Sequence, residues 1–79
     1  MKTKYRHFYI RESVFQCNNK PIYEILNNKT NDELGRIEWY AVWRKYIFCS
    51  NEFAIWDTGC LTDVIETIAE IPKEYEAYK

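Results

Sequence analysis

Cys60 is the residue whose type and position come closest to those of a catalytic group. It follows Asp57, Thr58 and Gly59, a run typical of a helix start, and a thiol in a first helical turn can have a lowered pKa. The negative charge of Asp57, three residues earlier, acts in the opposite direction. The only histidine, His7, stands near the other end of the chain. We therefore interpret Cys60 as a small buried residue at a helix entry and assign no catalytic residue.

Metal ligands are present, but their spacing is not that of a metal site. Cys17, Cys49 and Cys60 contain no CxxC pair, and His7 stands alone. Structural zinc sites use pairs of ligands at short spacings. The sequence therefore predicts neither a metal site nor a cofactor.

The carboxylates and glycines also lack a catalytic pattern. Glu66 and Glu70 are four residues apart, where a solvated pair on a helix surface is the ordinary interpretation. Gly35 and Gly59 are isolated, so there is no glycine-rich phosphate loop. Acid–base catalysis requires a pocket that shifts pKa values, for which so short a chain offers little room. We expect no enzymatic activity, and no small-molecule substrate is evident.

The composition is that of one folded domain covering residues 1–79. Hydrophobic residues make up 47% of the chain and aromatic residues 18%, well above the content of disordered proteins. No apolar run approaches the ~20 residues that span a membrane. The first residues lack the apolar segment of a signal peptide. Three separated cysteines without such a signal favour reduced thiols, so we expect a cytoplasmic protein without membrane association.

The first half of the chain predicts two strands followed by polar turns. The stretches YRHFYIRESVF and IYEILN are rich in aromatic and β-branched residues, and the turn sequences CNNK and NNKTNDE follow them. In the second stretch, alternation places Ile22, Glu24 and Leu26 on one face and Tyr23 and Ile25 on the other. In the first stretch, bulky residues occupy both alternating sets, so its facing stays open.

The densest aromatic stretch, GRIEWYAVWRKYIF at residues 35–48, predicts a β-hairpin. Ile37 and Trp39 share one face, and we expect Phe48 and Tyr46 to lie opposite them and form the floor of the core. The short run FAIW that follows is either a fifth strand or an edge segment.

A helix is predicted over about residues 58–71, with Asp57 or Thr58 as its N-cap. Its apolar stripe consists of Leu61, Val64, Ile65, Ile68 and Ile71. The polar face consists of Thr62, Asp63, Glu66, Thr67 and Glu70. Pro72 ends the helix, and a tail follows over residues 72–79. Since all connections between strands are short, the fold class is α+β: two layers, an antiparallel four- to five-stranded sheet, and one C-terminal helix packed on one face.

Two quoted segments carry a resemblance. The motif LGRIEWYxxWRKYIF, followed by CLTDVI, resembles a group of small uncharacterised proteins of phages, prophages and other mobile elements of bacteria. The likeness covers roughly residues 34–71. It implies a fold and a biological setting, with no activity attached.

The hairpin face opposite the core, together with the turn, holds the candidate binding residues. They are Arg36, Glu38, Tyr40, Trp43, Arg44 and Lys45. Tyrosine, tryptophan and arginine are the residues enriched at interface hot spots. The alternative interpretation is that most aromatics belong to the core and that arginines cover their edges.

We expect a small non-catalytic protein-interaction module that binds another protein or its own copy. The alternative is single-stranded nucleic-acid binding through the same aromatic and basic face. Residues 1–48 carry nine Lys and Arg against five Asp and Glu, whereas residues 49–79 carry two against seven. Such an asymmetry either steers a charged partner or is an ordinary solvated surface.

Overall fold

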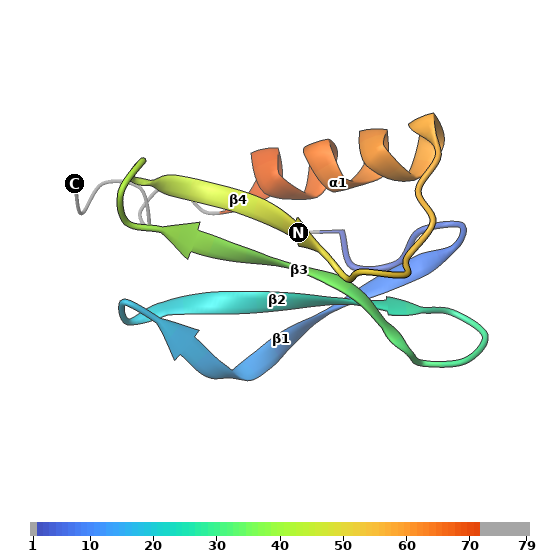
Figure 1. Ribbon diagram of the computed structural model, residues 1–79, viewed down its shortest axis with the longest axis horizontal. Helices are drawn as coiled ribbons and strands as arrows, with labels where there is room; N and C mark the ends of the chain where they lie inside the picture. The colour runs from blue at the N-terminus through green and yellow to red at the C-terminus, as the bar shows by residue number, and fades with distance from the viewer. Residues whose placement is uncertain (1, 72–79) are drawn as a thin grey trace.

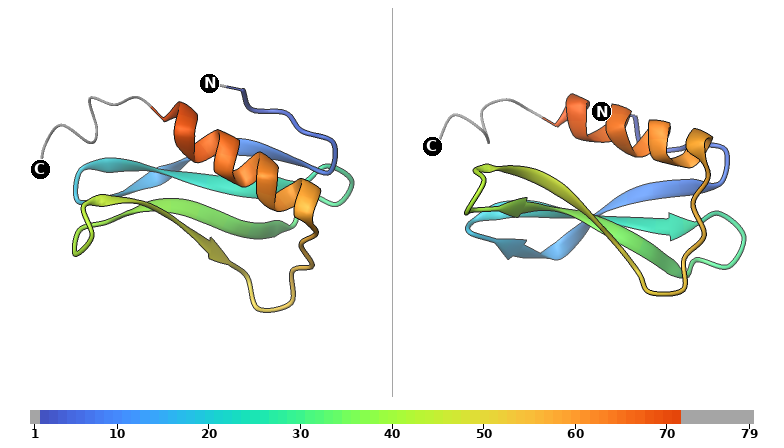
Figure 2. Two further views of the ribbon diagram at one scale, coloured as in Figure 1. Left: turned by 90° about the horizontal axis from the view of Figure 1, so that it is seen from above. Right: turned by 45° about the horizontal axis from the view of Figure 1, so that its top comes forward.

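The computed structural model describes residues 2–71, which form a four-stranded sheet and one helix (Figure 1). The strands are β1 (Phe8–Cys17), β2 (Lys20–Asn27), β3 (Glu33–Tyr40) and β4 (Lys45–Ser50), and the helix is α1 (Thr58–Glu70). Each strand pairs antiparallel with the next, in the order β1-β2-β3-β4. Figure 2 shows α1 lying across one face of the sheet, so the predicted two-layer α+β architecture is confirmed. The predicted stop at Pro72 and the tail over residues 72–79 lie outside the described residues.

Left-handed backbone conformations help to close the hairpins. Asn18 and Asn19, with φ of 53° and 62°, join β1 to β2, and Asn31 has a φ of 63° just before β3. Asparagine tolerates this conformation better than most residues do. Arg44, with a φ of 54°, ends the turn before β4. The polar sequences CNNK and NNKTNDE are thus turns, as the sequence predicts.

The pairing of β3 with β4 follows the predicted register. Ile37 lies opposite Phe48, and Trp39 lies opposite Tyr46 with an edge-to-face contact between ring centroids 5.5 Å apart. These residues pack with Val64 and other core residues beneath α1. The predicted floor of the core, formed by Ile37, Trp39, Tyr46 and Phe48, is therefore confirmed. This register could be predicted because side chains alternate between the two faces of a strand and the connection is short, so the two strands cannot easily shift along each other.

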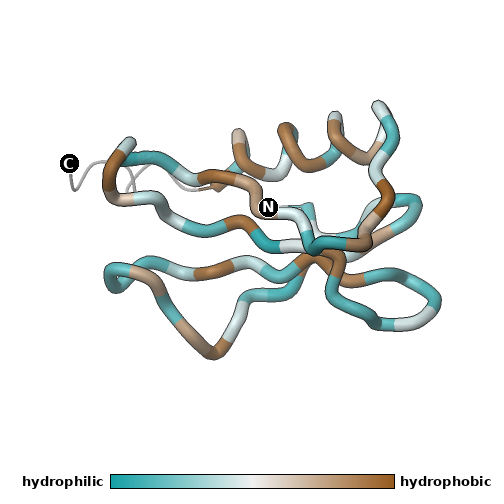
Figure 3. Tube along the Cα trace, in the orientation of Figure 1, coloured by the Kyte–Doolittle hydropathy of each residue, from teal (hydrophilic) through white to brown (hydrophobic). Residues whose placement is uncertain are grey.

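β1 changes direction in its middle, which explains why alternation alone did not give its facing. Phe8 and Ile10 are buried in the core, but the register with β2 shifts between Glu12 and Gln16. Figure 1 shows the bend, and Figure 3 shows hydrophobic residues at it. Val14 and Phe15 are exposed in this region, so this half of β1 adds little to the core.

The buried face of α1 differs from the predicted apolar stripe. Val64 is 2% exposed and Thr67 is fully buried, whereas Ile65 is 67% exposed and Leu61 is also exposed. The prediction that Leu61 and Ile65 face the core and that Thr67 faces solvent is therefore wrong. Cys60, Ile68 and Ile71 complete the face that packs on the sheet.

A long-range hydrogen bond explains the rotation of α1. Tyr5, from the segment before β1, places its hydroxyl 2.8 Å from Thr67 Oγ1, which also lies 2.9 Å from the Asp63 carbonyl oxygen. Because the carbonyl can only accept, Thr67 donates to it and accepts from Tyr5. The buried threonine hydroxyl is therefore satisfied on both sides, and a polar residue can occupy the core side of the helix.

The run FAIW forms no strand. Phe53 and Ile55 are almost fully exposed, while Trp56 packs edge-on against Phe48 with ring centroids 4.8 Å apart. Trp56 Nε1 also donates to Ser50 Oγ at 2.7 Å. One inward tryptophan thus anchors the connection to α1. Of the two predicted alternatives, a fifth strand is ruled out.

Candidate functional site

The turn between β3 and β4 carries an exposed aromatic and basic cluster, called here the hairpin tip. Its members are Tyr40, Val42, Trp43, Arg44 and Lys45. Tyr40 and Trp43 are in edge-to-face contact, with ring centroids 5.0 Å apart and planes at 89°. Trp43 is nevertheless 63% exposed, and Val42, Arg44 and Lys45 are exposed as well. A large aromatic ring is thus presented to solvent beside two cations.

The hairpin tip gathers four of the six predicted binding residues, but Arg36 and Glu38 lie apart from it. Both are on the outer face, meaning the sheet face opposite α1, in the middle of β3. Arg36 forms an ion pair with Glu33 at 2.9 Å, and Glu38 accepts a hydrogen bond from the Cys49 thiol, with Sγ and Oε1 3.7 Å apart. We therefore remove Arg36 and Glu38 from the candidate site.

Charged residues continue across the outer face. Arg11 of β1 forms an ion pair with Glu24 of β2 at 2.8 Å. Glu24 lies directly opposite Arg36 in the register of β2 with β3. Apolar residues of β2 on this side, Ile22 and Leu26, are buried. The centre of the outer face is therefore polar and internally paired, unlike the exposed aromatic face that the sequence predicts there.

The two edges of the sheet differ in their protection. Beside β1, residues before the strand pair with it, through a bridge between Lys4 and Tyr9 and a hydrogen bond from Ile10 N to Thr3 O at 2.7 Å. β1 is also interrupted by its register shift. Within residues 2–71, β4 is the last strand of the sheet, and Ile47, Phe48 and Cys49 in it include neither proline nor charge. Such an edge is a template for pairing with another strand.

The cysteine chemistry considered from sequence is disfavoured by the structure. Asp57 is the N-cap, and its Oδ1 accepts from Cys60 N at 2.8 Å. Burial raises the pKa of the Cys60 thiol above its usual value, and the adjacent Asp57 adds to this rise. Burial and Glu38 likewise raise the pKa of Cys49. Both thiols are therefore protonated near neutral pH, the state that is a poor nucleophile.

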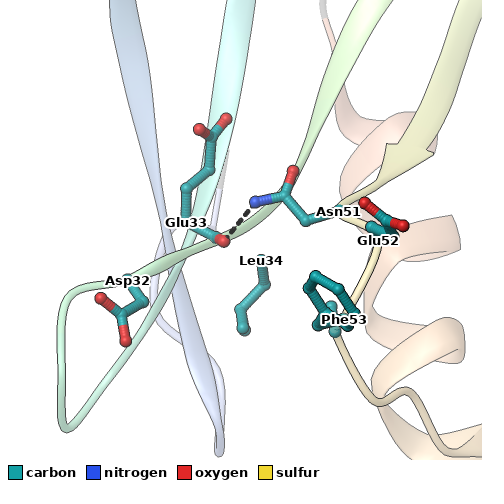
Figure 4. Close-up of a pocket in the computed structure, with 7 residues that line it drawn as sticks. Asp32, Glu33, Leu34, Asn51, Glu52 and Phe53 are labelled. Carbon is teal, nitrogen blue, oxygen red and sulfur yellow. Dashed lines mark hydrogen bonds between the residues drawn. The ribbon is translucent and has the colours of Figure 1, made fainter.

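An open groove of about 440 Å³ lies at the other end of the hairpin, where sequence analysis predicts no site. It is lined by residues 32–34 and 51–54. Figure 4 shows Leu34 and Phe53 within it, and the Asn51 side-chain amide donating to the Glu33 carbonyl oxygen. The carboxylates of Asp32, Glu33 and Glu52 point in different directions in this view, so they do not form a catalytic pair.

Several exposed apolar residues lie outside the sites that the sequence predicts. Besides Val42 they include Phe53 and Ile55, after β4, and Leu61 and Ile65, on α1. The signal available in sequence was the alternation of FAIW, which separates Phe53 and Ile55 from the anchored Trp56. The exposure of Leu61 and Ile65 carried no such signal, because both fit the apolar period of the helix.

Within residues 2–71, no group of three or more His, Cys, Asp or Glu is placed to hold a metal ion. Over the same residues, no helix combines the length and apolar character needed to cross a membrane. Comparison with known proteins gives no match to a protein-family model, a curated protein or a solved structure. A function must therefore be inferred from the geometry of the chain itself.

Proposed function

We propose that this chain is a small non-catalytic protein-interaction module that binds a partner protein through the hairpin tip and the adjoining edge of β4. The observation that carries the proposal is the exposure of Trp43, whose ring packs edge-to-face against Tyr40. Tryptophan, tyrosine and arginine dominate the energetics of protein interfaces. Because the ring is already oriented, ordering it on binding costs little entropy.

The edge of β4 supplies the second half of the binding surface. An extended segment of a partner can add to an open edge, where main-chain hydrogen bonds give affinity and side chains give specificity. β4 begins at Lys45, so its edge is continuous with the hairpin tip. The aromatic anchor and the open edge can therefore engage one partner together.

We also propose that the protein acts in the cytoplasm of a bacterial host. Three free cysteines and two thiols with raised pKa values are compatible with a reducing cytoplasm. The resemblance to proteins of phages and mobile elements makes a host protein a reasonable partner. The protonated thiols and the divergent carboxylates of the groove support the absence of catalysis.

Single-stranded nucleic-acid binding is the second candidate, favoured by one observation. Residues 39–48 include Arg44 and Lys45 but no acidic residue, so the exposed ring of Trp43 lies in a locally basic stretch. Aromatic side chains beside cations stack bases without sequence preference. The overall acidic pI of about 5.8 weighs against this candidate.

Affinity capture from bacterial lysate, with and without nuclease, separates the two candidates. The first predicts a captured protein that survives nuclease and moderate salt and is lost with Trp43→Ala. Nucleic-acid binding predicts retention that nuclease abolishes and that falls steeply with salt.

Phe15→Ala is the matched control, because Phe15 is another exposed aromatic residue, at the bend of β1. It should leave capture unchanged. Equal capture by wild type and Trp43→Ala would contradict a role for the hairpin tip in either candidate function.

A further inference from the structure

Two hollows meet at the end of the β3–β4 hairpin away from its tip. The first is the groove of about 440 Å³ described above, and the second, of about 390 Å³, extends to Asp57 and Cys60 at the start of α1. Leu34, Phe53 and Ala54 line both hollows, so the two form one surface, called here the end groove. Each volume lies within the range of about 300–1,000 Å³ that ligand sites occupy.

The segment between β4 and α1 leaves apolar side chains exposed along the end groove. Trp56 is anchored by the hydrogen bond from its Nε1 to Ser50, whereas Phe53 is 89% exposed and Ile55 is 92% exposed. Figure 4 shows Phe53 beside Leu34, which is half-buried. Apolar side chains that gather around a hollow, unlike single exposed ones, mark an interaction surface.

The main chain of the same segment has groups that can bond to a partner. Asn51 N donates to Leu34 O, and Ala54 N donates to Asn51 O. Ile55 and Trp56, in contrast, form no backbone hydrogen bond with any other residue from 2 to 71. An extended peptide binds such groups through its own main chain and places alternate side chains in pockets. A small molecule would instead need a site that encloses most of its surface, which an open groove does not provide.

The charge of the end groove indicates which kind of peptide fits. Its carboxylates are those of Asp32, Glu33, Glu52 and Asp57, no lysine or arginine lines it, and His7 is its only basic residue. Glu33 is neutralised by its ion pair with Arg36. Asp32 and Glu52 are exposed and form no ion pair with any residue from 2 to 71. Charge complementarity therefore favours a partner that carries lysine or arginine.

We propose that the end groove binds an extended segment of another protein, in which lysines or arginines flank an apolar side chain. The apolar side chain packs against Leu34 and Phe53, and the main chain of the segment bonds to that of Ile55. The flanking cations lie beside Asp32 and Glu52. The end groove is a second binding surface, separate from the hairpin tip, and goes beyond the proposed function.

NMR titration of the isotope-labelled full chain with the synthetic peptide Arg-Lys-Leu-Lys-Arg tests the proposal. The amide signals of Leu34, Phe53 and Ile55 should shift, and that of Trp43 should not. The peptide Arg-Lys-Ser-Lys-Arg has the same charge but should bind about tenfold more weakly, because it lacks the leucine side chain that the groove buries. The peptide Glu-Glu-Leu-Glu-Glu should not bind, since its charge is repelled.

Variants of exposed residues separate the groove from the rest of the surface without disturbing the core. Phe53→Ala and Glu52→Lys should each weaken binding of Arg-Lys-Leu-Lys-Arg about tenfold. Phe15→Ala is the matched control for the first, and Glu66→Lys is the control for the second, because Glu66 is an exposed carboxylate of α1 outside the groove. Both controls should leave the affinity unchanged.

Equal affinities for the leucine and serine peptides, or equal losses in Glu52→Lys and Glu66→Lys, would overturn the inference. It would also be overturned if the groove signals shifted with the concentration of the chain alone, since a second copy would then be the occupant. Trp43→Ala should leave peptide binding unchanged. The inference and the proposed function can therefore fail independently of each other.

Discussion

Replacing Val64 by alanine should destabilise the fold, whereas the same change at the neighbouring Ile65 should not. Val64 is 2% exposed beneath α1, and Ile65 is 67% exposed. Losing two buried methyl groups removes about 1.6 kcal/mol of burial free energy, and the cavity left behind adds to this loss. The higher helix propensity of alanine returns about 0.5 kcal/mol. The net loss for Val64→Ala is therefore about 1–2 kcal/mol.

This loss is large for so small a domain. A 79-residue chain is expected to have a free energy of unfolding of roughly 4–12 kcal/mol, and each kcal/mol lost lowers Tm by about 4–8 °C. Ile65→Ala should stay within about 0.5 kcal/mol of wild type, since it removes little buried surface and gains helix propensity.

Urea denaturation followed by tryptophan fluorescence measures both variants. Equal losses for the two variants, or a larger loss for Ile65→Ala, would refute the orientation of α1 on the sheet. If both residues faced the core, as the sequence predicts, Ile65→Ala would cost more stability than Val64→Ala.

Four further predictions concern other contacts. Tyr5→Phe and Thr67→Val should each cost about 1–2 kcal/mol and the double variant clearly less than their sum, which a double-mutant cycle in urea measures. Gly35→Ala should strongly lower Tm, because an added Cβ would lie 2.6 Å from the Cys49 carbonyl oxygen. Alkylation of Cys60 near pH 7 should be slower than that of a free thiol, since its pKa is raised, and Asp57→Asn should speed it. The hydrogen bond that Asp57 accepts from the Cys60 amide lowers the pKa of the Asp57 carboxyl. Asp57 therefore stabilises the fold at pH values above the pKa of an unfolded aspartate, and this stabilisation should be lost below about pH 4, as acid titration of the folded chain measures.

The hairpin and the helix boundaries could be predicted because local chemistry determines them. Alternation and a short connection fixed the facing of Ile37, Trp39, Tyr46 and Phe48. Asp57 is an N-cap by residue type and supplies the expected hydrogen bond at the helix start. These signals lie within a few residues of the features that they predict.

The remaining features depend on contacts between residues distant in sequence. The burial of Thr67 requires the hydroxyl of Tyr5, 62 positions earlier, and periodicity cannot reveal such a partner. Glu38 likewise accepts a hydrogen bond from the Cys49 thiol, 11 positions later, whereas the ion pair of Arg36 with Glu33 is local. For the candidate site, sequence could therefore identify the residue types but not which of them remain exposed.

Amide hydrogen exchange of β4 tests the central claim most directly. An edge strand directs half of its amide groups away from the sheet, where they exchange quickly unless another strand pairs with them. In the isolated chain, the outward amides between Ile47 and Ser50 should exchange fast, and binding of the partner protein should slow them. Exchange in β4 that is unchanged on binding, with protection appearing at β1 or on the outer face instead, would contradict the proposed binding surface.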